Sequence, residues 1–100
     1  MKKKKEKTPG AVLKSLMEEY QLTVFNLSRD IRIGYPTIFK LLGDETKVTC
    51  KIAFCLAKYF NTTPEYWLKL QLAADVNRLK KDKEFVSFIK TIGRARKIAD

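Results

Sequence analysis

The stretch that decides the fold is LTVFNLSRDIRIGYPTIFKL, residues 22–41. Read as two short helices joined by a tight turn, it has apolar residues at the spacing of a helix-turn-helix, namely Leu27, Ile31, Ile33, Ile38 and Leu41. Ser28 is small and lies where the second helix would cross the first closely. Because this motif presents its second helix to the major groove of DNA, the stretch predicts a candidate sequence-specific DNA-binding domain.

Helical patterns continue on both sides of this stretch, and no segment shows strand-like alternation. Apolar spacing predicts helices over about 10–20, 24–31, 49–60, 64–80 and 83–92, and another that has Pro36 in its first turn and ends near residue 42. Four of these helices begin after a residue that can act as an N-cap, namely Thr23, Thr49, Thr63 and Asp82. The sequence therefore predicts an all-α protein.

The charge distribution divides the chain into three parts. The net charge is +10, and the basic excess lies at the two ends, while the centre is nearly neutral. We expect a disordered basic arm over residues 1–8, a helix-turn-helix domain over 9–80, and a C-terminal helix with a basic tail over 81–100. Basic tails commonly hold phosphate backbones without reading sequence. The alternative is that these lysine-rich ends only keep the protein soluble.

The residue inventory argues against catalysis and metal binding. The chain has no histidine, and its two cysteines, Cys50 and Cys55, are five residues apart on one predicted helix, where they point in different directions. Two thiols without histidine are too few for a structural zinc site, and the commonest general base is missing. We therefore expect a non-enzyme with no catalytic residues, no metal and no cofactor. No apolar run reaches the length of a membrane span, so we expect a cytoplasmic protein with reduced thiols.

The helix predicted at 64–80 carries two apolar stripes. One stripe contains Trp67, Leu70 and Ala74, and we expect Trp67 to lie in the core, facing the preceding helix. A second stripe indicates a further partner surface, which suits the mate in a homodimer and consists of Leu68, Leu72, Val76 and Leu79. The alternative is that the C-terminal segment of the same chain covers this stripe.

Two short motifs flank the helix-turn-helix and carry a family resemblance. They are the Pro9-Gly10-x-x-Leu13 opening and the run from Thr63 to Gln71, TPEYWLKLQ. Over about residues 9–75 the chain resembles the HigA-type antitoxins of the phage-repressor-like (XRE) helix-turn-helix family. The resemblance implies a five-helix repressor-like domain, here followed by a C-terminal amphipathic helix. It also implies a homodimer that binds double-stranded operator DNA, represses its own operon and neutralises a small ribonuclease toxin.

The resemblance also assigns DNA contacts by position. They come from the start of the second helix, the outer side of the third and the loop that follows it. The backbone-contacting positions are Thr23 and Val24, the base-facing positions are Tyr35, Pro36, Thr37 and Lys40, and the loop position near phosphate is Lys47.

This chain departs from the family pattern in its recognition elements. Relatives often have Gln at position 24 and Gly at position 32, whereas this chain has Val24 and Arg32. Glycine permits a left-handed turn, in which another residue costs about 1 kcal/mol. The third helix also lacks Arg, Asn and Gln, which make the strongest bidentate base contacts. These departures leave two alternatives open: a protein-interaction module with a degenerate helix-turn-helix, and a stand-alone regulator without a toxin.

Overall fold

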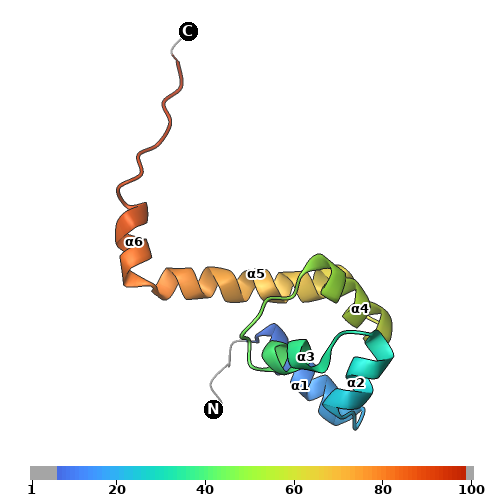
Figure 1. The fold of residues 1–100 in the computed structure, drawn as a ribbon. Helices are drawn as coiled ribbons and strands as arrows, with labels where there is room; N and C mark the ends of the chain where they lie inside the picture. The colour runs from blue at the N-terminus through green and yellow to red at the C-terminus, as the bar shows by residue number, and fades with distance from the viewer. Residues whose placement is uncertain (1–6, 99–100) are drawn as a thin grey trace, which may run out of the picture.

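The computed structural model describes residues 7–98, which form six α-helices and no strand (Figure 1). The helices are α1 (Pro9–Glu19), α2 (Val24–Ile31), α3 (Tyr35–Leu42), α4 (Cys50–Phe60), α5 (Pro64–Lys81) and α6 (Lys83–Ile89). The prediction of an all-α fold is confirmed. The predicted bounds agree within one or two residues, except that α6 ends at Ile89 rather than near residue 92.

Local capping explains where several helices begin. The side chains of Thr23, Thr49, Thr63 and Asp82 each accept a hydrogen bond from a backbone N–H in the first turn of the helix that follows, as predicted. Thr8 does the same for α1, since its Oγ1 accepts from the Ala11 amide at 3.1 Å. Thr8, expected from the sequence to lie in the basic arm, is therefore the N-cap of α1. Residues 1–6 of that arm lie outside the described residues.

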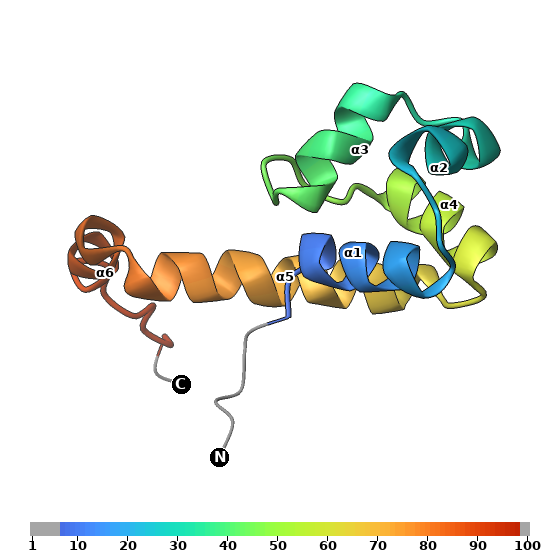
Figure 2. The ribbon, with the colours of Figure 1, turned by 90° about the horizontal axis from the view of Figure 1, so that it is seen from below.

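The helices α1 to α4 gather around the first part of α5, which continues past them as a long rod and ends at α6 (Figure 1). Seen from below, α1 lies alongside α5, and α4 packs between α2 and α5 (Figure 2). The helix pair α2 and α3 therefore sits at the side of the molecule, away from α6.

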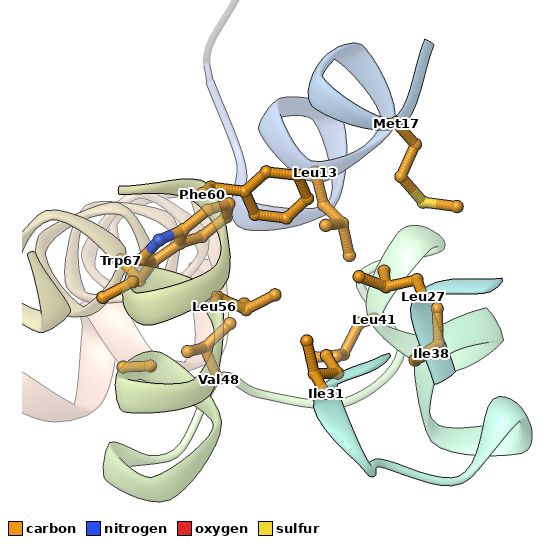
Figure 3. Close-up of a cluster of buried hydrophobic side chains, with 12 residues drawn as sticks. Leu13, Met17, Leu27, Ile31, Ile38, Leu41, Val48, Leu56, Phe60 and Trp67 are labelled. Carbon is orange, nitrogen blue, oxygen red and sulfur yellow. The ribbon is translucent and has the colours of Figure 1, made fainter. Parts of the chain in front are cut away.

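A hydrophobic core fills the space between α1, α2, α3, α4 and the start of α5 (Figure 3). Trp67 is its largest member and is 0% exposed, which confirms its predicted place in the core. The indole Nε1 donates a hydrogen bond to Thr62 Oγ1 at 2.9 Å, so the polar atom of the ring is satisfied. Among the described residues, every core side chain lies between Leu13 and Trp67 in the sequence.

Gly10 marks the closest approach between α1 and α3. A Cβ atom at this position would lie 2.5 Å from the Leu41 carbonyl oxygen and 2.7 Å from that of Leu42. The Gly10 amide also donates a hydrogen bond to Asp44 Oδ1 at 2.9 Å. The Pro-Gly opening of α1 thus has a steric cause, because no larger residue fits against the end of α3.

Candidate nucleic-acid interface

The turn between α2 and α3 has the geometry that a helix-turn-helix requires. Arg32 ends α2 in the left-handed conformation, with φ 61° and ψ 40°, and its N–H donates to the Ser28 carbonyl at 2.8 Å. The left-handed turn expected at this position is therefore present, although the residue is not glycine. Ser28 Oγ donates to the Ile33 carbonyl at 2.6 Å, so this small side chain also binds the turn to α2.

Two further contacts fix the ends of α2. At its start, Thr23 Oγ1 accepts from the Asn26 amide at 3.0 Å, while Asn26 Oδ1 accepts from the Thr23 amide at 3.4 Å, which makes a capping box. Near its end, the Tyr59 hydroxyl of α4 donates to Asp30 Oδ2 at 2.6 Å. This hydrogen bond, together with Arg29, lowers the pKa of Asp30. The same hydrogen bond to Asp30, together with partial burial, raises the pKa of Tyr59.

The side chains expected to face DNA differ in how far they are exposed to solvent. Tyr35, Pro36 and Lys40 are exposed on the outer side of α3, and Thr37 is half-buried. Thr23 is exposed at the start of α2. Val24 is half-buried and packs against the core instead.

Lys47 follows α3 in the loop to α4 and is bound to α5. Its Nζ lies 3.3 Å from Asp75 Oδ2. Gln71 strengthens the same attachment, because its Oε1 accepts from the Val48 amide at 2.8 Å and its Nε2 donates to Asp75 Oδ1 at 3.1 Å. The phosphate contact expected of Lys47 thus competes with an ion pair to α5.

Asp75 is the acceptor at the centre of this attachment. Arg78 on the following turn of α5 also donates to its Oδ1, at 2.8 Å. Partial burial alone would raise the pKa of Asp75, but the hydrogen bonds from Gln71, Arg78 and Lys47 together lower it. The carboxylate therefore holds its charge while it joins the loop to the helix.

Two aromatic side chains on this surface were not predicted from the sequence. Phe25 and Phe39 are both exposed, and each packs its ring against Tyr35, with centroid separations of 5.0 Å and 6.1 Å. The available signal was the spacing of Tyr35 and Phe39, which are four residues apart on α3 and off the core stripe of Ile38 and Leu41.

The second stripe of α5 is largely uncovered in the single chain. Leu68 is half-buried, whereas Leu72, Val76 and Leu79 are exposed. The C-terminal segment covers this stripe only in part, because α6 packs on α5 while Leu72, Val76 and Leu79 stay exposed at 62%, 40% and 42%. Phe88, Ile89 and Ile92 are exposed beside it.

Cys50 and Cys55 are free thiols. Across the part of the chain that the structure describes, no three His, Cys, Asp or Glu residues are grouped as metal ligands would be. None of the described helices is both long and apolar enough to cross a membrane.

The intact turn and the exposed α3 define a helix-turn-helix protein. An uncharacterised HTH-type transcriptional regulator of Haemophilus influenzae is 30% identical over 86 residues, which cover 85% of this chain and 80% of the relative. The chain belongs to the helix-turn-helix transcriptional regulators. It matches no family model.

Solved structures place the fold among antitoxins. An addiction module antidote protein of the HigA family from Coxiella burnetii is 29% identical, with a TM-score of 0.77 over 92% of this chain and 100% of that one. The antitoxin GraA, solved in complex with its operator, has a TM-score of 0.79 at 23% identity, over 97% and 98% of the two chains. The Coxiella burnetii protein belongs to the HigA family, which is the family that the sequence resembles.

Proposed function

We propose that this protein is a sequence-specific DNA-binding repressor that acts as the antitoxin of a type II toxin–antitoxin module and regulates its own operon as a dimer. The observation that carries the proposal is an intact helix-turn-helix turn, with Arg32 left-handed and Ser28 bonded to Ile33, that leaves the outer side of α3 open. Its structural neighbours include an antitoxin solved with its operator. A repressor of this kind works in the cytoplasm, where it meets its DNA.

In this proposal α3 enters the major groove, and basic side chains around it supply affinity. Lys40 projects from the outer side of α3, and Lys47 lies in the loop that follows. Contacts between lysines and phosphates release counterions, so affinity falls steeply as salt rises. Lys47 would exchange Asp75 for phosphate, which an exposed ion pair permits because such pairs contribute little to stability.

The dimer interface in this proposal is the second stripe of α5. Its exposed members, Leu72, Val76 and Leu79, are large apolar side chains on one helix face, and the apolar side chains of α6 adjoin them. A twofold axis through this surface would give two copies of α3, each for one operator half-site about one DNA turn from the other. The toxin, a small ribonuclease in the proposal, would bind elsewhere on this dimer.

A binding titration tests the proposal. Fluorescence anisotropy should detect preferential binding of the full chain to the DNA upstream of its own gene over a random duplex, with affinity that falls as salt rises. Lys40→Ala should weaken this binding about tenfold, within the 1–3 kcal/mol range for a base contact, and leave the melting temperature unchanged. Lys58→Ala, an exposed lysine on α4, is the matched control and should bind normally.

Equal and weak binding to random DNA would contradict sequence-specific repression. The protein-interaction alternative rests on the same exposed apolar residues of α5 and α6. It would be favoured if the chain formed a stable complex with the product of the adjacent gene and had no DNA affinity even at low salt. If the chain bound its promoter and had no toxin partner, it would be a stand-alone regulator.

A further inference from the structure

The outer side of α3 carries an exposed aromatic residue, Phe39, that the family-based assignment leaves out. Successive residues of a helix are about 100° apart around its axis. With Ile38 and Leu41 buried, the direction opposite to the core falls close to Pro36, with Phe39 on one side of it and Lys40 on the other. Phe39 is 52% exposed, whereas Thr37, which the assignment includes, is half-buried. Phe39 therefore adds an exposed aromatic ring to the outer side of α3.

Phe39 belongs to a continuous aromatic ridge, which we define as Phe25, Tyr35 and Phe39. Tyr35 is the middle member, with its ring centroid 5.0 Å from that of Phe25 and 6.1 Å from that of Phe39. All three are exposed, Phe25 at 62% and Tyr35 at 47%. Since exposed apolar clusters on small proteins mark binding surfaces, the ridge needs a partner outside the described residues of this chain.

The chemistry of α3 limits how it can read bases. It carries no Arg, Asn or Gln for bidentate hydrogen bonds, and Lys40 is its one charged side chain. Apolar side chains, phenylalanine included, distinguish thymine from the other bases through its C5 methyl group, which lies in the major groove. We propose that the aromatic ridge contacts thymine methyl groups in the operator, with Phe39 as the central specificity-determining residue. This inference rests on the proposed function.

The charge beside the ridge identifies DNA as the occupant. Lys40 follows Phe39 directly in the sequence and is exposed on the same outer side of α3. No acidic side chain lies on α3. A major groove offers methyl groups to the ring and phosphate or guanine acceptors to the lysine at once. A purely apolar protein partner would leave the ammonium of Lys40 without a counter-charge.

The test replaces thymine by deoxyuridine, which lacks only the C5 methyl group and keeps the base-pairing atoms. Footprinting first locates the sequence that the full chain protects upstream of its own gene. Anisotropy then compares a thymine duplex of that sequence with one in which deoxyuridine replaces every thymine. Each contacted methyl group should be worth about fourfold in affinity, equivalent to about 0.8 kcal/mol for one buried carbon.

Variants assign that preference to the ridge. Phe39→Ala should bind the thymine duplex more weakly and bring the ratio of the two affinities close to one, and Phe39→Leu should keep part of the ratio. Phe54→Ala is the matched control, because Phe54 is an exposed phenylalanine on α4, and it should behave as wild type. Thermal unfolding should show all three variants folded, since the replaced rings are half or more exposed.

Each contrary outcome is decisive. Equal affinity of the wild type for the two duplexes would overturn the ridge proposal while leaving the proposed repressor function standing. A thymine preference that persists in Phe39→Ala would also overturn it, since another residue would then read the methyl groups. If the wild type has no preference for its own promoter, the proposed function fails first and this inference fails with it.

Discussion

The two halves of α5 have the same kind of amphipathic sequence and opposite surroundings. In the first half, Trp67 is enclosed by the core and Gln71 is hydrogen-bonded to the loop after α3. In the second half, Leu72 and Val76 are exposed, although α6 packs on the helix. A closed core and an open apolar surface therefore share one helix. The comparison teaches that an apolar stripe shows a helix has a partner, but not that the partner is in the same chain.

The largest loss of stability should come from a mutation in the first half of α5, which the core encloses. Trp67→Ala should lower the free energy of unfolding by about 3–5 kcal/mol, because it removes a fully buried ring and leaves a cavity. Urea unfolding followed by circular dichroism measures this change. Phe54→Ala, at an exposed site on α4, should shift it by less than about 0.5 kcal/mol. Native-like stability of Trp67→Ala would show that the core does not enclose the first half of α5.

A mutation in the second half of α5 should change dimer formation rather than folding. Leu72→Glu should convert the proposed dimer into a folded monomer, since a charge would be buried at the interface. Sedimentation velocity measures the change, and operator affinity should fall by about a hundredfold as the second binding site is lost. Ala73→Glu adds the same charge at an exposed position of α5 outside the stripe and should leave the dimer intact. An unchanged dimer in Leu72→Glu would place the interface elsewhere.

A smaller change in stability should come from relieving backbone strain at residues that end a helix in the left-handed conformation. Arg32 has φ 61°, so Arg32→Gly should raise the free energy of unfolding by up to about 1 kcal/mol. Asn61 has φ 58° at the end of α4, but asparagine tolerates this conformation better. Asn61→Gly should therefore gain less in the same urea titration. If Asn61→Gly and Arg32→Gly raised the free energy of unfolding equally, the residue type would not set the cost of the left-handed conformation.

The smallest effect should be a pH-dependent change in stability at Asp75, which joins the loop after α3 to the middle of α5. Its pKa is lowered in the folded protein, so its contribution to stability is present above its unfolded pKa of about 3.9. That contribution is lost as the pH falls through the lower folded value. The stability of Asp75→Asn should therefore approach that of wild type in acid and fall below it near neutrality. A pH-independent difference between the two proteins would contradict this role.

The fold was predictable because its signals are local. The capping residues Thr23, Thr49 and Thr63 lie directly before their helices, and the apolar spacing of each helix identifies its buried side. The turn at Arg32 was also predictable, since the two helices around it leave room for few backbone conformations. Each of these features depends on residues that are close together in the sequence.

The remaining features depend on contacts between distant segments. Nothing near Lys47 in the sequence indicates its ion pair with Asp75, 28 residues later, and nothing near Gly10 indicates the carbonyl groups of α3 above it. Phe39 was missed for a related reason. The family pattern assigns base contacts to fixed positions, and only the fold shows that Phe39 is exposed beside Tyr35. The DNA contacts themselves remain proposals.

The loop after α3 is bonded to Gln71 and Asp75 on α5. These bonds fix the rotation of α5 about its own axis relative to α3. Inserting one residue after Asp75 would rotate every later side chain of α5 by about 100° around its axis and leave the core up to Trp67 unchanged. Val76 and Leu79 would then point in a new direction relative to α3, whereas Leu68 and Leu72 would keep theirs. In the proposed dimer, the angle at which two copies present their α3 helices would therefore depend on the number of residues between Asp75 and Leu79.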